Sequence, residues 1–327
     1  MHLFYIMVKL LIVGGKPPPQ KTSNINTYGG YIMSNFVLSC TSPVDLKKQQ
    51  LVDRNISYSC FKYQLGNDVL VDDFGETLPY PEFYRRMVDG DDTKTSQTGI
   101  GEYLDYFSAI LSEGNDLLHI CISSGLSGDF NSANSAALIA RERFPDRKLL
   151  LVDSLGASSG YGLLVDMAAD LRDNGMDIDT LYDWLNQNRL NMHHWFYSSD
   201  LTFFVRGGRI SKAAGLFGGM LNICPVMNMD NLGRLIPRAK VRSKKRAIAE
   251  LFDRMLKHAD GGENYSGKVY ISHSQCYDDV KALAEMIEQR FTKMSGKVEV
   301  YDIGSTIGCH TGPGTVALFF WGDTRIN

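Results

Sequence analysis

Short apolar runs alternate with longer amphipathic segments from residue 36 onward. The apolar runs are four to ten residues long and favour strands, and the segments between them repeat their apolar positions with helical spacing. Strands and helices in strict alternation are typical of a parallel sheet with helices packed on it. The predicted strands are residues 36–40 (FVLSC), 56–65 (ISYSCFKYQL), 117–122 (LLHICI) and 148–154 (KLLLVDS), and the predicted helices are 46–54, 80–89, 100–111, a segment ending at Phe144 and one beginning near Ala157.

The second half of the chain continues with an amphipathic helix over residues 176–190 and then changes texture. Next come a strand and a basic helix (GRLIPRAKVRSKKRAIAELF). They are followed by a second strand, KVYISHSQ, with another helix after it, and by a last apolar segment (TVALFFWG). The length of the whole chain, 327 residues, suggests two domains of about 150 residues each. We expect an extension outside the fold over residues 1–32, an N-terminal α/β domain over 33–175 and a C-terminal α/β domain over 176–327.

Residues 1–32 carry an apolar stretch that Lys9 interrupts. It is shorter than the roughly 20 apolar residues that a membrane-spanning helix needs, no basic segment precedes it and no small-residue cleavage site follows it. Met33 lies directly before the first predicted strand, so we expect translation to begin there or residues 1–32 to lie outside the fold.

Composition excludes several classes of partner. The 34 basic and 37 acidic residues are mixed along the chain and give a net charge of −3, which disfavours nucleic acid and anionic lipid. Six cysteines without a C-x-x-C pair are typical of free thiols in the cytoplasm. The histidines, among them His193, His194, His273 and His310, have no metal-binding spacing, and we expect neither a metal nor a cofactor.

A serine-glycine segment, SSGLSG at residues 123–128, lies where a predicted strand meets a predicted helix. Ligands of open parallel sheets bind at this end of the strands, where the N-terminus of a helix attracts negative charge. Hydroxyl groups supply donors and acceptors, and glycines allow the backbone to approach a ligand. A purely structural alternative is that Ser127 or Asp129 caps the following helix. The residues concerned are Ser123, Ser124, Gly125, Ser127 and Gly128.

Two further segments have similar chemistry. KTSQTG, at residues 94–99, offers Thr95 and Ser96 before a predicted helix, and CHTGPG, at residues 309–314, places His310 beside a threonine in a turn that Pro313 restricts. If the three segments converge, they form a site for a carboxylate or a phosphate.

Other kinds of site are less well supported by the sequence. A hydrolase would need Ser124 as nucleophile, His310 as base and an aspartate such as Asp153, but the G-x-S-x-G signature of the nucleophile turn is missing. Neither a Walker A sequence nor a G-x-G-x-x-G sequence is present. Arg206 and Arg209 lie in a glycine-rich turn and are expected at the surface.

Several of these motifs, in this order, resemble the DegV family of bacterial fatty-acid-binding proteins. The resemblance extends from Met33 to the end of the chain and depends on the order of the motifs more than on any one of them. The motifs are TSQ, SSGLSG with NSA after it, VDS, GGRI, VRSKKRAI and HTGPG.

This resemblance implies an α/β fold of two domains: an N-terminal domain with a parallel sheet flanked by helices, and a second, smaller α/β domain. A tunnel at their junction would hold one long-chain fatty acid. The protein would not be an enzyme. It would present the fatty-acid carboxyl group to a separate ATP-dependent fatty acid kinase of the dihydroxyacetone-kinase type, and the acyl phosphate would supply phospholipid synthesis. The alternatives are a serine-dependent enzyme acting on acyl or phosphorylated small molecules and a lipid-sensing regulator.

By resemblance, Thr95 or Ser96, Ser124 and His310 bind the head group, and Ser123, Gly125 and Ser127 support them. Arg209 of GGRI corresponds to a surface residue that docks the kinase. Two positions depart from the family pattern: Thr98 replaces a proline, and Thr41 with Ser42 replaces an aspartate-serine pair. We expect Leu216, Phe217 and Leu221 in the tunnel wall.

Overall fold

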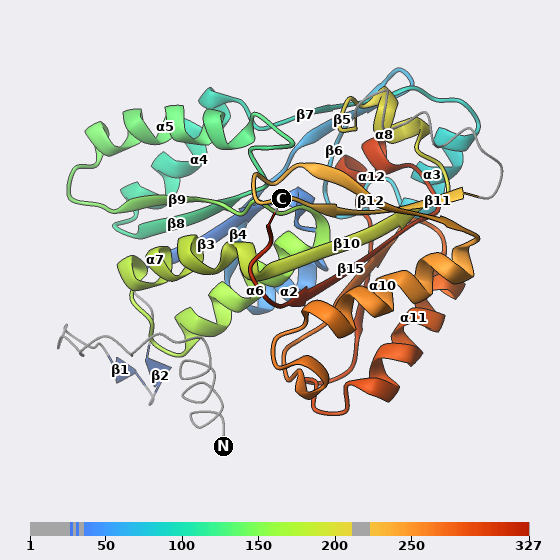
Figure 1. Cartoon of the computed structure of the whole chain (residues 1–327). Helices are drawn as coiled ribbons and strands as arrows, with labels where there is room; N and C mark the ends of the chain where they lie inside the picture. Colours follow the sequence, from blue (N-terminus) through green and yellow to red (C-terminus); the bar gives the residue numbers. More distant parts are fainter. Residues whose placement is uncertain (1–26, 29–30, 33–35, 211–222, 327) are drawn as a thin grey trace. The chain divides into compact units, whose positions relative to one another are not determined.

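The computed structural model describes residues 27–28, 31–32, 36–210 and 223–326 (Figure 1). The chain divides into two compact units, Met1–Met33 and Ser34–Asn327. In the first unit, the short strands β1 (Thr27–Tyr28) and β2 (Tyr31–Ile32) pair in antiparallel fashion. All the elements below belong to the second unit. Within the described ranges, no helix is long and apolar enough to cross a membrane.

A four-stranded parallel sheet, with strand order β4-β3-β8-β9, forms the first layer. Its central strands are almost fully buried, as expected where helices cover both faces. Helices α4 and α5 pack on one face, and α6 and α7 lie on the other (Figure 1). The bounds are β3 (Phe36–Thr41), β4 (Ile56–Ser59), β8 (Asp116–Cys121), β9 (Leu149–Asp153), α2 (Lys48–Asp53), α4 (Ile100–Ser112), α5 (Asp129–Arg143), α6 (Ser158–Asp173) and α7 (Ile178–Asn188).

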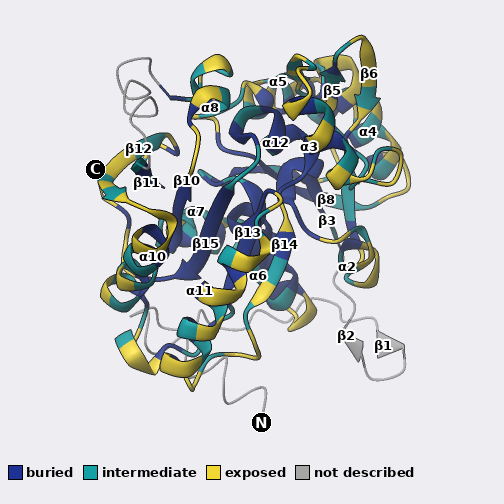
Figure 2. Cartoon of the chain, turned by 90° about the vertical axis from the view of Figure 1, so that its right-hand side faces the viewer, coloured by how far each residue is buried: buried dark blue, intermediate teal, exposed yellow. Residues whose placement is uncertain are grey.

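The second sheet has six strands in the order β12-β11-β10-β15-β13-β14, of which only β13 and β14 pair in parallel. Strands β10 and β15 are buried along their whole length, and Figure 2 shows them in the dark-blue centre. Helices α10 and α11 contact the sheet. The bounds are β10 (Met192–Ser198), β11 (Ile223–Met229), β12 (Leu235–Arg242), β13 (Tyr270–His273), β14 (Glu299–Asp302), β15 (Thr315–Trp321), α10 (Lys244–His258) and α11 (Tyr277–Arg290).

A small antiparallel sheet, β6-β5-β7, completes the unit together with short helices. It divides the predicted strand 56–65 between two sheets, because the chain leaves β4 at Ser59 and enters β5 at Lys62. It also includes the first three residues of the KTSQTG segment, for which no strand was predicted, as part of β7. The bounds are β5 (Lys62–Leu65), β6 (Asp68–Val71), β7 (Thr93–Ser96), α3 (Tyr80–Val88), α8 (Thr202–Arg206), α12 (Ser305–Thr311) and the 3-10 turns Ser42–Val44, Arg189–Asn191 and Gly262–Asn264.

Helix α6 lies between the two large sheets. Thirteen of its 16 residues are buried, because it contacts β3 of the parallel sheet as well as β10, β13 and β15 of the six-stranded sheet. An amphipathic helix with one apolar stripe could not satisfy both neighbours. The absence of a side chain at Gly160 lets α6 approach Phe319 and His194 of the six-stranded sheet, and at Gly162 it lets α6 approach Val44 and Leu46, which follow β3.

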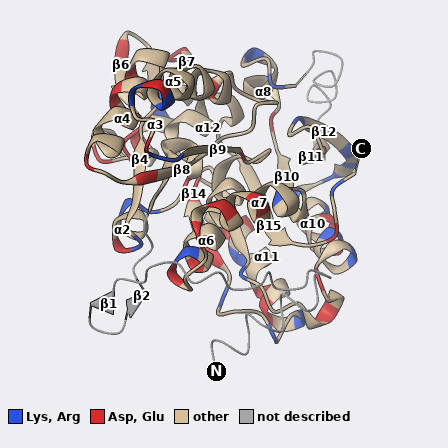
Figure 3. Ribbon diagram, turned by 90° about the vertical axis from the view of Figure 1, so that its left-hand side faces the viewer, with Lys and Arg blue, Asp and Glu red and all other residues tan. Residues whose placement is uncertain are grey.

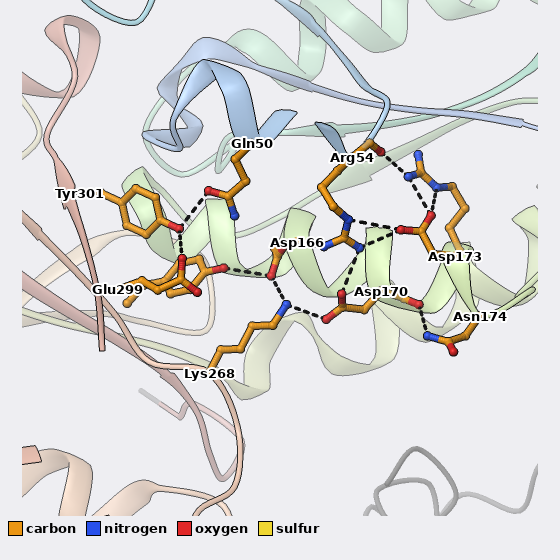
Figure 4. A network of polar contacts seen from close by, with 11 residues as sticks. Gln50, Arg54, Asp166, Asp170, Asp173, Asn174, Lys268, Glu299 and Tyr301 are labelled. Carbon is orange, nitrogen blue, oxygen red and sulfur yellow. Dashed lines mark hydrogen bonds and ion pairs between the residues drawn. The ribbon is translucent and has the colours of Figure 1, made fainter. Parts of the chain in front are cut away.

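Asp166, Asp170 and Asp173, in the second half of α6, join these layers through ion pairs (Figure 4). Asp166 is 2% exposed and accepts hydrogen bonds from Arg54 Nη1 (2.8 Å), the Tyr270 hydroxyl (2.9 Å) and the Lys268 ammonium. Asp170 bonds the same two cations, Arg54 at 3.0 Å and Lys268 at 2.8 Å. Because Arg54 follows α2 and Lys268 precedes β13, this cluster ties the six-stranded sheet to the layer of α2 and α6.

Basic and acidic residues are interspersed on the side shown in Figure 3, with acidic residues on α6. All six cysteines are free; Cys40, Cys121, Cys224 and Cys309 are buried, and Cys60 and Cys276 are half-buried. The predicted fold class is confirmed: a parallel sheet flanked by helices is combined with a second sheet that has helices of its own.

Candidate functional site

An apolar cavity lies between the carboxyl ends of β8 and β9 and one face of the six-stranded sheet. It contains about 790 Å³ of space free of atoms, part of it open to solvent. Aliphatic and aromatic side chains form most of its wall, and hydroxyl and imidazole groups interrupt it at a few points. An apolar cavity with a few polar groups is the usual form of a small-molecule site. Its apolar lining includes Ile122, Leu126, Phe196, Phe204, Met229, Leu235, Ile307, Ala317 and Phe319.

Thr95 and His310 meet in the wall of this cavity. Thr95 Oγ1 and His310 Nε2 share a hydrogen bond of 2.8 Å, and the Thr93 hydroxyl donates to the Cys309 carbonyl at 3.1 Å. Strand β7 therefore contacts the last turn of α12 through two residues on the same face. The sequence predicted a turn around His310, but the structure places this residue inside α12.

The imidazole of His310 is neutral at physiological pH. Burial, reinforced by the positive charge of Arg209, lowers the pKa of His310 to about 4. A neutral ring beside the Thr95 hydroxyl offers hydrogen bonds to an anionic head group without forming an ion pair with it.

Ser96 does not share this environment. It is exposed and is not a lining residue of the cavity, whereas its neighbour Thr95 is half-buried and lines it. Successive side chains of a strand point to opposite faces, so β7 can turn only one of these two hydroxyls toward the cavity.

The serine-glycine segment forms a single tight turn after β8, in which Leu126 N and Ser127 N both donate to the Ser123 carbonyl at 3.1 Å. The buried Ser123 hydroxyl donates to the Gly233 carbonyl (2.8 Å) and accepts from Gly125 N (3.1 Å). Ser127 lines the cavity and accepts from Asp129 N at 3.2 Å, so it also bonds the first turn of α5. Ser124 is exposed and lies outside the cavity lining.

The residues of a serine-hydrolase triad do not meet here. Asp153 Oδ1 accepts from the backbone N–H groups of Ser124 and Leu155, both at 3.1 Å, and His310 Nε2 is bonded to Thr95. The two groups that would have to act as base and orienting carboxylate, His310 and Asp153, therefore have other partners.

Arg209 lies in the cavity wall rather than on an open surface. It is half-buried, and it donates from Nε to the Leu126 carbonyl (3.2 Å) and from Nη1 to the Gly207 carbonyl (2.6 Å). Burial lowers its pKa, and no carboxylate of the described residues forms an ion pair with it. Arg209 also borders a neighbouring open groove, which Gly125, Gly208 and Arg234 help to line.

Other polar residues of the cavity wall were not predicted from the sequence. Ser158 lines the cavity and donates to the buried carboxyl group of Asp45 at 2.5 Å, and burial raises the pKa of Asp45 well above its usual value. Ser158 begins a second Ser-Ser-Gly triplet after β9, which repeats the triplet after β8. This repetition could have predicted Ser158 as a residue of the site. His194, Thr306, Thr311 and Thr315 also line the cavity.

Thr41 and Ser42, which depart from the family pattern, are not lining residues of the cavity. Thr41 Oγ1 lies 3.3 Å from the Tyr161 hydroxyl, and Ser42 donates to Asp72 at 3.0 Å. Leu216, Phe217 and Leu221, expected in the tunnel wall, lie outside the described residues.

One group of possible metal ligands occurs elsewhere in the described part of the chain, formed by His193, His258 and Asp323. Trp195 Nε1 donates to His193 Nδ1 at 3.2 Å, so a neutral His193 carries its proton on Nε2, which lies 3.0 Å from Asp323 Oδ1. A metal-binding histidine instead turns its remaining N–H toward an acceptor. The observed arrangement fits a hydrogen-bonded group better than a metal site.

Asp129, the first residue of α5, makes a testable contribution to stability. Burial raises its pKa to about 7, while the Tyr103 hydroxyl donates to it at 2.8 Å. The folded protein therefore retains this proton more strongly than the unfolded chain. The resulting stability is complete below about pH 4 and is lost as the pH rises through about 7. Because of Asp129, we expect the free energy of unfolding to fall by about 2 kcal/mol as the pH rises from about 5 to about 7.

Urea denaturation of the native protein and of Asp129→Asn at both pH values measures this effect. The difference in the free energy of unfolding between the two proteins should change by that amount, in favour of the variant at the higher pH. A difference that stays constant with pH would show that Asp129 titrates normally.

Comparisons with known proteins agree with one another. Residues 40–323 match the family model described as "Uncharacterised protein, DegV family". A DegV domain-containing protein of Clostridium perfringens is 33% identical over 293 residues, covering 90% of this chain and 99% of that protein. The DegV domain-containing protein YteA of Lactococcus lactis is 37% identical over 227 residues, which are 69% of this chain and 76% of YteA.

Solved structures show the same fold. A DegV family protein from Thermus thermophilus, described for its fatty acid binding, has a TM-score of 0.77 at 25% identity and covers 88% of this chain and 99% of its own. The Fatty Acid Kinase (Fak) B3 protein of Streptococcus pneumoniae, loaded with linoleic acid, has a TM-score of 0.77 at 22% identity and covers 89% of this chain and 100% of its own. With a family model matched over residues 40–323, the chain belongs to the DegV family.

Proposed function

We propose that this protein binds one long-chain fatty acid and presents its carboxyl group to a separate ATP-dependent fatty acid kinase. The observation that carries the proposal is the apolar cavity with the Thr95 and His310 hydrogen bond in its wall. The fatty acid binding described for the Thermus thermophilus relative and the linoleic acid in the Streptococcus pneumoniae Fak B3 protein support it.

The acyl chain supplies the affinity. Burial of each methylene group contributes about 0.8 kcal/mol, so a chain of about sixteen carbons gains on the order of 10 kcal/mol before the entropy of binding is subtracted. The lining residues of the cavity are mainly apolar, which suits such a chain.

The head-group chemistry suits a carrier. The pair formed by Thr95 and the neutral His310 offers hydrogen bonds to a carboxylate, while the charge of Arg209 is close enough to influence His310. A carboxylate oxygen left free of a tight ion pair keeps its nucleophilicity. In the kinase it attacks the γ-phosphorus of ATP, the bond to the bridging oxygen breaks, and acyl phosphate and ADP form.

Arg209 is proposed to dock the kinase. It reaches the open groove beside the cavity, and its charge is not neutralised by a carboxylate of the described residues. A guanidinium in this situation can form a forked pair with a carboxylate of a partner protein. Its position in the wall of the cavity would bring the kinase next to the head group.

The test is to purify the protein, identify its bound lipid by mass spectrometry, and add the cognate kinase with ATP. We expect intact fatty acid to be recovered and converted to acyl phosphate. Arg209→Ala should retain the lipid but need a carrier concentration about tenfold higher for the same rate.

Arg206→Ala is the matched control, because Arg206 is exposed and carries no role in this proposal. If Arg209→Ala loses its lipid, Arg209 binds the head group and the docking role is wrong. Turnover of acyl esters by the protein alone would support an enzyme instead. A bound fatty acid that no kinase of the same cell phosphorylates would support a lipid sensor.

A further inference from the structure

The face of the six-stranded sheet that lines the cavity runs away from His310 along β15. Alternate residues Thr315, Ala317 and Phe319 point into the cavity. Thr315 lies four positions after the end of α12, which carries His310, and Phe319 lies a further four positions along the strand. At about 3.3 Å per residue, Phe319 is about 13 Å beyond Thr315.

Strand β10 supplies the partner of Phe319 at this end. His194 pairs with Phe319 in the antiparallel ladder, and the two rings meet edge to face with centroids 5.3 Å apart. Both side chains are buried, and both line the cavity. They therefore form a wall at the end of the strands distant from the head-group residues.

The His194 ring is fixed in place. Its Nδ1 lies 3.1 Å from the Met192 carbonyl, and its Nε2 accepts from Ala157 N at 3.3 Å. Burial lowers its pKa well below the usual value, so the ring is neutral. With both nitrogens engaged by the backbone, His194 presents a surface that suits the end of a hydrocarbon chain.

Helix α6 supports both rings from behind at Gly160. A Cβ atom at this position would lie 2.4 Å from Phe319 Cδ1 and 2.5 Å from His194 Nε2, too close for either ring to stay where it is. Gly162, two residues further along but on another side of α6, would bring its Cβ within 2.6 Å of the Val44 carbonyl and 2.7 Å of Leu46. The two glycines have similar steric limits, but only Gly160 supports the end wall.

We propose that His194 and Phe319, backed by Gly160, form the closed end of the cavity and set the longest acyl chain that the protein accepts. The inference rests on the proposed fatty-acid binding. A methyl group at Gly160 pushes the two rings toward the cavity and shortens it, and a smaller residue at Phe319 lengthens it.

The experiment measures the affinities of dodecanoate, tetradecanoate, hexadecanoate and octadecanoate for the delipidated native protein, Gly160→Ala, Gly162→Ala and Phe319→Leu. Each methylene group that no longer fits should cost about fourfold in affinity. We expect Gly160→Ala to lose affinity for the longest chains and to keep it for dodecanoate. Phe319→Leu should shift the preference toward longer chains, and Gly162→Ala should keep the native ranking.

The outcomes separate this inference from the proposed function. Fatty acids that bind to all four proteins with the same ranking would overturn the end wall and leave fatty-acid binding intact. If Gly160→Ala does not fold, Phe319→Leu decides, because an unchanged ranking there contradicts the inference. A native protein that binds none of the four acids would overturn the proposed function itself.

Discussion

Replacing Asp166 by asparagine is expected to lower the free energy of unfolding by about 3–5 kcal/mol. Asp166 is buried and accepts hydrogen bonds from Arg54, Lys268 and Tyr270 (Figure 4). Removal of its charge leaves two partly buried cations with less compensation, and the loss of a partner from a buried ion pair is among the largest effects of single substitutions. Urea denaturation at neutral pH measures the change.

Asp170→Asn is the matched control for this prediction. Asp170 lies one helical turn further along α6 and bonds the same two cations, but its side chain is 33% exposed. Water compensates a more exposed charge, so we expect a loss of about 1 kcal/mol or less. Equal losses in the two variants would show that burial of Asp166 adds nothing to the strength of the cluster.

Thr95→Val is expected to weaken the binding of hexadecanoate by about 5–150-fold, the equivalent of about 1–3 kcal/mol. Valine has nearly the same shape but cannot bond His310, so both the imidazole and the bound carboxylate lose a partner in the cavity wall. The affinity of the delipidated protein, measured by calorimetry, tests this expectation.

Ser124→Ala is the informative comparison, because the family resemblance assigns Ser124 to the head-group site. The exposed Ser124 lies outside the cavity lining, and among the described residues only its backbone N–H has a specific partner, Asp153. We therefore expect an unchanged affinity. A loss as large as that of Thr95→Val would mean that the serine-glycine turn rearranges around the ligand.

The strands of the large sheets were predictable because their stability comes from their own side chains. Residues 36–40, 117–122 and 148–154 are apolar runs, and the structure places β3, β8 and β9 there. Strand β7 (TKTS) has no apolar run. It exists because it pairs with β5 and bonds α12 through Thr93 and Thr95, and neither partner is near it in the sequence.

The candidate site was predictable at the level of segments but not of single side chains. All three hydroxyl-rich segments supply lining residues of the cavity, namely Thr95, Ser127 and His310. Which serine or threonine faces inward depends on the alternation along β7 and on the tight turn at Ser123. Sequence alone would have needed the strand assignment of β7 to choose Thr95 over Ser96.

The position of β15 has a consequence for how the protein is made. This last strand of the described chain lies between β10 and β13. It contacts α6, and its side chains line the cavity. Synthesis proceeds from the N-terminus, and domains generally fold in that order on the ribosome. The parallel sheet can assemble as soon as β9 has emerged, but the strands β10 and β13 keep unpaired inner edges until residues 315–321 are synthesised. Unpaired strand edges attract other chains, so the nascent protein is most vulnerable to aggregation after β13 has emerged and before β15 pairs with it.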